Sequence, residues 1–319
     1  MLWSVVNLFR GFAVLSALLA FAIAVLGSWV RINDAGLTCP DWPLCHGALV
    51  PALHGGVVLE WSHRFVAFVE SFVVLGVILT GFRLRERIAG VTPALVALAA
   101  IFAVQVSLGG ATVLLGNSPL SVMLHWGMGM ALLAVLTALA VLAVFAPSPA
   151  SGTSVRIAFR DGAAPSLCVA GALAFVTMCI GAYVSSSHAG LACTTVPACD
   201  GSLLGNGAAQ LAQMLHRIAA FAFFGAAVIA TYAAWHGSSR RVRFFATAGL
   251  TLVVVQIGLG IGNIVWQLPV ALREAHAANA GATFLAFVMA TVFSALEPYR
   301  AFERRADRAL GSRRIAPLA

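Results

Sequence analysis

Charge is scarce in this sequence. Only 9% of its 319 residues are charged, and lysine is absent, so all nineteen basic residues are arginines. A soluble domain carries about 25% charged residues, which means that this chain has too few to cover a surface exposed to water. With 61% hydrophobic residues and a mean hydropathy of +0.96, the chain is expected to be an all-α integral membrane protein.

Apolar runs long enough to cross a bilayer recur along the chain. A helix needs about 20 mostly apolar residues to span the hydrocarbon core. The first run is too long for a signal peptide, and Trp29, Val30 and Arg31 follow it in place of a cleavage site of small residues. Eight transmembrane helices are predicted, at residues 11–30, 64–82, 93–115, 122–146, 166–186, 214–235, 244–266 and 275–296.

The arginines are distributed unevenly between the two sides that these spans define. If the N-terminus is cytoplasmic, four arginines lie on the outer side: Arg31, Arg64, Arg217 and Arg273. The other fifteen lie on the inner side, as the positive-inside rule requires. Both termini are therefore predicted to be cytoplasmic, in the cell (inner) membrane. The basic tail is expected to contact anionic membrane lipid, and no nucleic-acid partner is expected despite the net charge of +8.

Two loops on the outer side carry the same pair of cysteines. GLTCPDWPLCHG at 36–47 returns as GLACTTVPACDG at 190–201, so that Cys39 and Cys45 correspond to Cys193 and Cys199. The outer compartment is oxidising. Four cysteines allow three pairings, and the repeat favours one disulfide within each loop. Such a disulfide is either a structural staple or a redox-active dithiol, although the spacing is not CxxC.

The repeat extends through most of the chain. EWSHRFVAF at 60–68 matches QMLHRIAAF at 213–221, and QVSLGGATVL at 105–114 matches QIGLGIGNIV at 256–265. The sequence therefore predicts two tandem, pseudo-symmetric four-helix bundles, residues 1–150 and 151–319. Because each half has an even number of spans, both enter the membrane in the same direction, and the axis relating them should follow the membrane normal.

Four histidines occupy equivalent places in the two halves. His63, His125, His216 and His276 are each expected at the start of an even-numbered span. A single histidine there is commonly an interfacial residue, but the recurrence of a pair in each half favours function. Two imidazoles facing each other across a bundle are suited to axial ligation of haem iron. The sequence thus predicts one pair of haem ligands in each half.

The residues around these histidines add further hypotheses. Arg64 and Arg217 each follow a predicted ligand and are expected either to bind haem propionates or to anchor a span at the interface. Small residues give the third and seventh spans faces that suit close helix contact or a flat macrocycle. These glycines are Gly109, Gly110, Gly258, Gly260 and Gly262.

One difference between the halves bears on chemistry. Glu60 lies three residues before His63, whereas Gln213 lies three residues before His216. A carboxylate takes up a proton or stabilises developing positive charge, and an amide does neither well. The first half is therefore predicted to be the reactive one, unless Glu60 only caps its helix. Glu70, deeper in the same span, is interpreted as a buried structural group or a proton carrier.

Together these motifs resemble the haem A synthase family, membrane enzymes that convert haem O to haem A for terminal oxidases. The resemblance rests on GSWVRINDAGLTCPDWPLCHG at 27–47, EWSHR at 60–64, the histidine of the fourth span, and their second-half counterparts. It implies that haem O binds as substrate in the first half, at His63 and His125. It also implies that a haem b is held in the second half, at His216 and His276.

The resemblance assigns roles to other residues as well. Glu60 matches the essential acid of the family, and Cys39 and Cys45 match loop cysteines proposed to form a disulfide. Cys193 and Cys199 match cysteines found in part of the family. The implied reaction oxidises a ring methyl group of haem O twice, to an alcohol and then to a geminal diol that loses water to leave a formyl group. The implied partners are haem O, haem A, the synthase that produces haem O, and an electron acceptor.

Two other functions are compatible with a duplicated membrane bundle. A dihaem electron-transfer protein resembling cytochrome b would have equal ligand surroundings in the two halves, in contrast to Glu60 and Gln213. A transporter would have broken helices and polar groups at the bilayer midplane. Apart from Glu70, the polar groups here gather near the predicted outer side.

Overall fold

Long helices account for nearly all of the structure, a computed structural model that describes residues 2–86, 88, 91–145 and 161–313. Eight of the helices in this part of the chain are long and apolar enough to cross a membrane, which confirms the predicted number of spans. Their bounds are α1 Leu2–Ile32, α2 Gly55–Arg83, α3 Val91–Leu114, α4 Pro119–Phe145, α5 Ala164–Ser186, α6 Ala208–Trp235, α7 Arg240–Val265 and α8 Val270–Arg313. A short 3₁₀ helix, η2, covers Ala189–Leu191.

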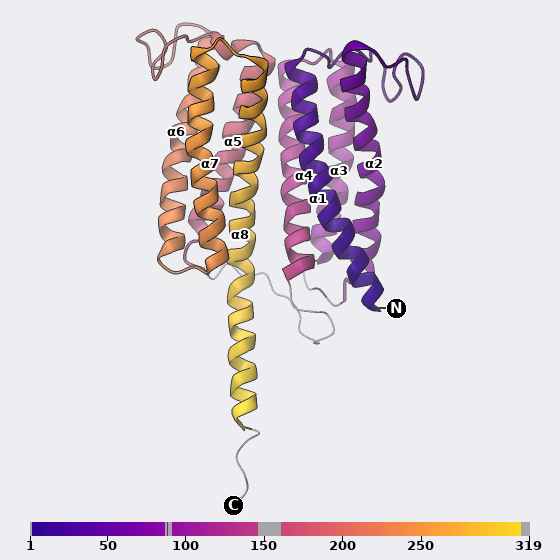
Figure 1. Cartoon of the computed structure of the whole chain (residues 1–319), viewed down its shortest axis with the longest axis vertical. Helices are drawn as coiled ribbons and strands as arrows, with labels where there is room; N and C mark the ends of the chain where they lie inside the picture. The colour runs from indigo at the N-terminus through magenta and orange to yellow at the C-terminus, as the bar shows by residue number, and fades with distance from the viewer. Residues whose placement is uncertain (1, 87, 89–90, 146–160, 314–319) are drawn as a thin grey trace, which may run out of the picture.

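The helices pack in two groups of four (Figure 1). Within the first group α1 packs on α2 and α4, and α3 packs on α4; within the second, α5 packs on α6 and α8, and α7 packs on α8. The groups meet through α4 against α5 and through α8 against α1 and α4. The two cysteine loops lie at the end of the bundle opposite the termini, which we call the loop end. The predicted division between residues 150 and 151 falls outside the described residues.

Several helices are longer than hydropathy predicted. Helices α2 and α6 begin at Gly55 and Ala208, and α4 and α8 begin at Pro119 and Val270. Each of the four histidines therefore lies more than one turn inside its helix and not at its start, where the sequence had placed it. Polar residues shortly after these starts, Glu60 and Ser62 in α2 and Gln210 and Gln213 in α6, lower the hydropathy of a window placed there. Contacts with the loops hold them helical: Trp61 Nε1 donates to Leu49 O at 2.9 Å, and Gln210 Nε2 donates to Ala192 O at 3.2 Å.

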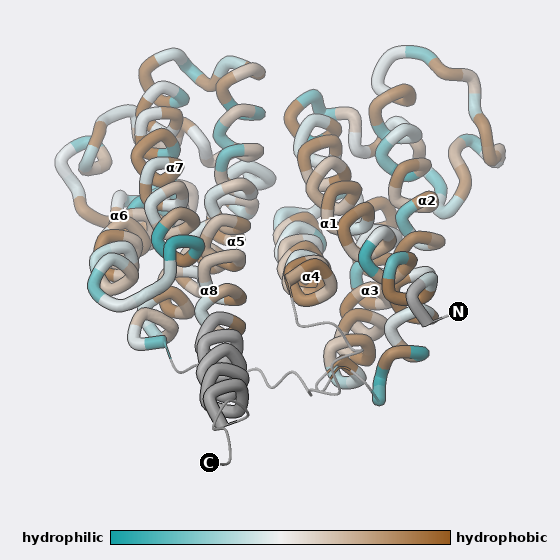
Figure 2. The backbone as a smooth tube through the Cα atoms, turned by 60° about the horizontal axis from the view of Figure 1, so that its bottom comes forward, coloured by the Kyte–Doolittle hydropathy of each residue, from teal (hydrophilic) through white to brown (hydrophobic). Residues whose placement is uncertain are grey.

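Apolar side chains cover both the inside and the outside of the bundle. The buried core joins the two groups through residues such as Phe9, Leu133 and Phe287, while large side chains such as Phe68 and Tyr232 are exposed. Figure 2 shows hydrophobic residues along the lengths of the helices. Such a surface suits lipid, where apolar groups need no burial in protein. The free thiol of Cys168 in α5 is also exposed.

Candidate functional site

Each of the four histidines packs against a glycine of a neighbouring helix. A methyl group placed on Gly27 of α1 would lie 2.8 Å from Cε1 of His63, too close for any real contact. Gly181 of α5 stands in the same relation to His216, again at 2.8 Å. A methyl group placed on Gly109 or Gly260 would lie 3.1 Å from Cε1 of His125 or 3.3 Å from Cε1 of His276. These glycines therefore make room for the imidazole rings, and the pattern is the same in both halves.

The ring pair of the second half has the spacing of two axial ligands. The centroids of His216 and His276 lie 6.4 Å apart, with an angle of 67° between the planes. An imidazole nitrogen lies about 2 Å from the metal that it ligates and about 1 Å from its own centroid, so two rings sharing one iron would have centroids about 6 Å apart. His216 Nδ1 lies 3.1 Å from Thr177 O, a second-shell contact that orients a ligand ring. The residues present thus fit a haem iron.

The two histidines of the first half also face the cavity. His63 and His125 both line the same cavity as the second pair, but among the described residues no ring contact joins them. Their Nδ1 atoms are buried without a hydrogen-bond partner. Within the same described residues, no group of three or more His, Cys, Asp or Glu side chains is placed to hold a metal ion. A pair of histidines suits haem iron, because the macrocycle supplies the other ligands.

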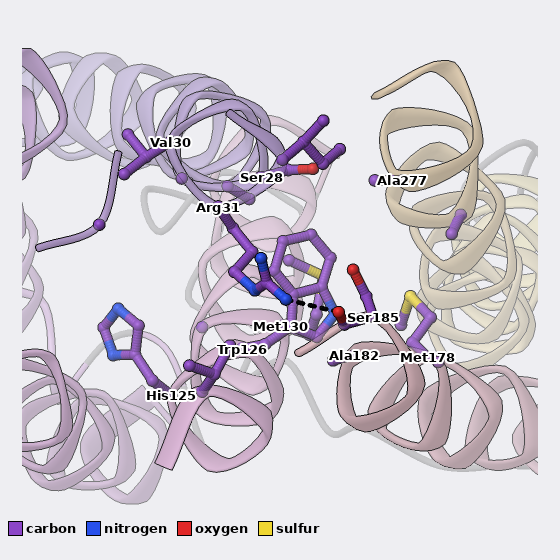
Figure 3. A pocket seen from close by; sticks show the side chains of 18 of the residues that line it. Ser28, Val30, Arg31, His125, Trp126, Met130, Met178, Ala182, Ser185 and Ala277 are labelled. Atoms are coloured by element: carbon purple, nitrogen blue, oxygen red, sulfur yellow. Dashed lines mark hydrogen bonds between the residues drawn. The ribbon is translucent and has the colours of Figure 1, made fainter. Parts of the chain in front are cut away.

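A single large cavity connects the two histidine pairs. Its volume is about 1270 Å³, and residues of both helix groups line it. Pockets for drug-sized ligands measure about 300–1,000 Å³, so this cavity has room for more than one such ligand. Figure 3 shows Trp126 and Met130 of α4 opposite Met178 of α5, between the groups. The two candidate sites are therefore parts of one continuous space.

Polar contacts tie the two groups together near the loop end. Arg31 of α1 donates from Nη2 to Ser185 O of α5 at 2.5 Å (Figure 3). Ser185 is the position that corresponds to Arg31 in the repeat, 154 residues later. Ser28 donates to Glu274 Oε2 of α8 at 2.9 Å, and Arg273 donates to Ile32 O at 3.3 Å. Side chains present in only one half thus make the junction between the halves.

Glu60 holds the first cysteine loop against α2. Its Oε2 accepts hydrogen bonds from Cys39 N at 2.8 Å and Thr38 Oγ1 at 2.9 Å, and its Oε1 is paired with Arg64 Nη2 at 2.6 Å. The residue is 3% exposed and lines the cavity. It lies beyond the first turn of α2, whose N-cap is His54. Its carboxylate therefore binds the loop and does not cap the helix.

Gln213 makes the equivalent contacts in the second half. Its Oε1 accepts from Cys193 N at 2.6 Å, and its Nε2 donates to Gly190 O at 2.8 Å. The residue is 4% exposed and also lines the cavity. The two halves thus share one framework at this position, and the chemical difference is that only the first half places a carboxylate on the cavity wall.

Arg64 and Arg217 hold the same loops by their backbone carbonyls. Arg64 donates to Cys39 O at 2.9 Å and to Asp41 O and Leu44 O, both at 2.7 Å. Arg217 donates to the corresponding carbonyls of the second loop, those of Cys193, Thr195 and Ala198. These hydrogen bonds therefore hold each loop against its helix. Both arginines also line the cavity, so binding of haem propionates stays a prediction.

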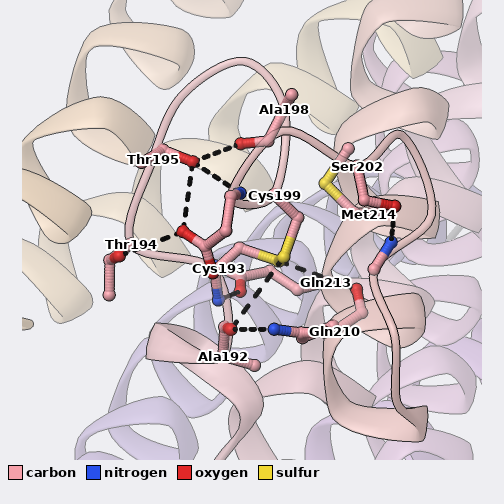
Figure 4. Close-up of a disulfide and its surroundings, with 12 residues drawn as sticks. Ala192, Cys193, Thr194, Thr195, Ala198, Cys199, Ser202, Gln210, Gln213 and Met214 are labelled. Carbon is pink, nitrogen blue, oxygen red and sulfur yellow. Dashed lines mark hydrogen bonds between the residues drawn. A yellow bond between two sulfur atoms is a disulfide. The ribbon is translucent and has the colours of Figure 1, made fainter.

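Each loop is closed by a disulfide, as the repeat predicted. Cys39 is joined to Cys45 and Cys193 to Cys199, and all four residues are buried. In both loops an isolated antiparallel β-bridge follows the disulfide, between Cys45 and Ala48 in the first loop and between Cys199 and Ser202 in the second. Figure 4 shows the second disulfide enclosed by its loop beside α6. Reactive cysteines are accessible to solvent, so this burial favours the structural role over a redox-active one.

The exposed side of the first loop has its own fixed turn. The Asp41 carboxylate accepts hydrogen bonds from Gly47 N at 2.8 Å and His46 N at 2.7 Å. These backbone bonds, that of Gly47 foremost, hold the pKa of Asp41 below its usual value. The turn therefore stays ordered at neutral pH, where the carboxylate is ionised.

Removal of the second disulfide is expected to loosen the loop without unfolding the protein. Replacing both Cys193 and Cys199 by serine releases a short closed loop, whose constraint is worth about 2 kcal/mol. The bonds from Gln213 and Arg217 to the loop backbone remain. We expect a lower apparent melting temperature in detergent, with reducing agent, which opens both disulfides, lowering that of the wild type by at least as much. Unchanged melting in both measurements would contradict the staple role.

Known proteins that resemble this chain belong to one family and share one name. The family model described as cytochrome oxidase assembly protein, COX15-CtaA, matches residues 10–57 and 53–288. A protein of Bacillus licheniformis named heme A synthase is 28% identical, over 84% of this chain and 90% of its own length. Proteins of the same name from Shewanella oneidensis and a Caulobacter species are 26% and 28% identical, over 85% and 87% of this chain and 91% and 92% of their own lengths. The chain belongs to the COX15-CtaA family.

Proposed function

We propose that this protein is a haem A synthase, which oxidises a ring methyl group of haem O to the formyl group of haem A. The family match and the consistent names of its relatives support this function. The structural observation that carries it is the contrast between Glu60 and Gln213. Both side chains bind the backbone N–H of an equivalent cysteine, beside equivalent histidines, yet only one is a carboxylate.

The second half, residues 151–319, holds haem b in this proposal. His216 and His276 would hold its iron, a role that their ring spacing supports. Haem b supplies one-electron transfer when bound. The protein's contribution is to orient the two rings, through Gly181, Gly260 and the carbonyl of Thr177, and to keep the site dry among apolar helices.

The first half, residues 1–150, binds haem O as substrate at His63 and His125. Glu60 is the catalytic carboxylate: its ion pair with Arg64 and its bonds from the loop fix its position on the cavity wall. Oxidation leaves the methyl carbon electron-poor, and a fixed negative charge stabilises that carbon. Each of the two hydroxylations removes two electrons, which pass to the proposed electron acceptor, and with water as the oxygen donor it releases two protons, one of which the same carboxylate is placed to take up. The diol formed by the second hydroxylation loses water to give the formyl group.

The predicted topology completes the proposal. Both termini lie on the cytoplasmic side of the cell membrane, and the cysteine loops lie on the oxidising outer side, where their disulfides are stable. Within the described residues the eight spans are continuous helices, unlike the broken helices of transporters. The synthase that makes haem O and an electron acceptor are the proposed partners within the membrane.

Pigment extraction tests the proposed function directly. The protein is produced in a host that makes haem O but no haem A, purified, and its extracted haems are separated by chromatography. We expect haem A together with haem b. Two haem b per chain and no haem A would favour an electron-transfer protein, and the absence of any haem would contradict the assignment of all four histidines.

A further inference from the structure

A second buried carboxyl group lines the cavity of the first half. Glu70 of α2 is 2% exposed and lies seven residues after His63, which places both on one helix face. Its Oε1 accepts a hydrogen bond from Ser16 Oγ of α1, and Ser16 is itself fully buried. Its Oε2 has no hydrogen-bond partner. A polar atom in such surroundings costs free energy unless a ligand or water satisfies it.

The second half lacks this polar pair. Phe223 occupies the position of Glu70, and Ala170 that of Ser16, 153 and 154 residues later; both are buried. The polar pair is therefore not needed to build the bundle, since the same framework forms without it. It belongs to the half that is proposed to bind substrate.

Gln105 of α3 also differs from its second-half counterpart. Its Oε1 is buried without a partner, and the side chain lines the cavity. Its counterpart Gln256 is satisfied, because Oε1 accepts from Asn279 Nδ2 at 2.7 Å and Nε2 donates to His276 O at 3.0 Å. The first-half cavity thus presents unmatched polar atoms at two positions whose second-half equivalents are apolar or paired.

These polar atoms lie on the side of the histidines away from the loop end. Helix α2 runs from the loop end toward Arg83, so Glu70 is about 10 Å deeper than His63 along its axis. Glu60 lies about 4.5 Å from His63 in the opposite direction. Helix α3 runs toward the loop end, which places Gln105 one turn deeper than Gly109. A ligand held by His63 is therefore flanked by a carboxyl group on each side.

We infer that Glu70, which lines the cavity and is held in place by Ser16, forms a binding subsite for a hydroxyl group of the substrate. The inference rests on the proposed function and deepens it. Haem O differs from haem b in carrying a hydroxyl-bearing farnesyl side chain in place of a vinyl group, and that side chain and the oxidised methyl belong to different pyrrole rings. A hydroxyl both donates and accepts hydrogen bonds, so it satisfies Oε2 of Glu70. The subsite thereby distinguishes haem O from haem b at the end of the cavity opposite Glu60.

The test compares the binding of haem O and haem b to purified protein. The protein is produced in a host that makes haem b only, and each haem is then added in a titration followed by absorbance. Glu70→Leu is expected to weaken haem O binding about tenfold, the effect of losing a buried hydrogen bond, and to leave the added haem b unaffected. Ser16→Ala is expected to act in the same direction with a smaller change. Glu70→Gln should bind almost as the wild type does, because an amide also donates and accepts.

Other outcomes would overturn the inference in distinguishable ways. Equal weakening of both haems would make Glu70 a structural residue, and unchanged binding with lost turnover would make it a proton carrier. Equal losses in Glu70→Gln and Glu70→Leu would also exclude the hydroxyl contact. Thr80→Val is the matched control: Thr80 is a buried polar residue of α2 that bonds to Gly76 O at 2.6 Å.

The double variant Ser16→Ala with Glu70→Phe reproduces the second-half residues and should lose the preference for haem O. Because binding is measured without turnover, this result is independent of haem A formation. A wild-type protein that makes no haem A would contradict the proposed function, whereas a wild type without preference for haem O would contradict only the subsite.

Discussion

Replacing Glu60 by glutamine is expected to abolish haem A formation while the protein stays folded and keeps its haem b. Turnover should fall by about 10²–10⁴, the range for loss of a positioned acid–base or charge-stabilising group. The amide keeps the size of the carboxylate but carries no charge and takes up no proton. Haem A and haem b extracted from equal amounts of purified protein, together with the rate of haem A formation, provide the measurement.

The fold is expected to survive because the second half already uses this arrangement. A glutamine at position 60 can accept from Cys39 N and donate to Gly36 O, as Gln213 does with Cys193 N and Gly190 O. Arg64 would lose its carboxylate partner but keep the carbonyls of the loop, which are the contacts that hold Arg217. The variant therefore gives the first half the chemistry of the second.

The reciprocal change supplies the control. Gln213→Glu places a carboxylate beside Arg217, in the half that is proposed only to hold haem b, and should leave haem A formation within a factor of a few of the wild type. Full activity in Glu60→Gln would contradict the catalytic assignment. Equal losses in both variants would mean that the side chains act only by holding the loops.

The helices were predictable because hydrophobicity is a property of long runs of residues. Hydropathy found all eight spans, but it placed the start of α2 at residue 64 when the helix begins at Gly55. The missing residues include the polar Glu60, Ser62 and His63, and the contacts that stabilise this part of the helix come from a loop whose backbone path no periodic pattern encodes. Helix α8 also continues to Arg313, beyond the apolar segment that hydropathy detects.

The site was predictable where the repeat supplied two copies of a signal. The histidines and the cysteine pairs recur at offsets of 151 to 154 residues, and so do Gly27 and Gly181, whose contact with a histidine ring we did not predict. That recurrence is a signal that could have revealed them. The bond between Arg31 and Ser185 O carries no such signal, because it depends on how the two helix groups pack against each other.

Adding a methyl group at Gly181 is expected to remove haem b. In Gly181→Ala the new Cβ would lie 2.8 Å from Cε1 of His216, so the ring must move. The contact of His216 Nδ1 with Thr177 O resists that movement, and the 6.4 Å spacing to His276 is lost. Disturbing the orientation of a metal ligand costs about 10–100-fold in affinity. Haem b per chain after purification, and the low-spin absorbance of the protein, measure the effect.

Two further glycines make this prediction specific. Gly171 lies in the same helix, and a Cβ there would meet no atom within 4 Å, so Gly171→Ala should keep its full haem b and slightly favour the helix. Gly27→Ala presses on His63 at 2.8 Å in the other half; it should leave haem b in place and weaken the binding of added haem O. Loss of haem b in Gly27→Ala, or its full retention in Gly181→Ala, would contradict the division of roles between the halves. The two substitutions thus add one methyl group at equivalent positions and press on equivalent histidines. Gly181→Ala is read by the loss of haem b, and Gly27→Ala by weaker binding of added haem O.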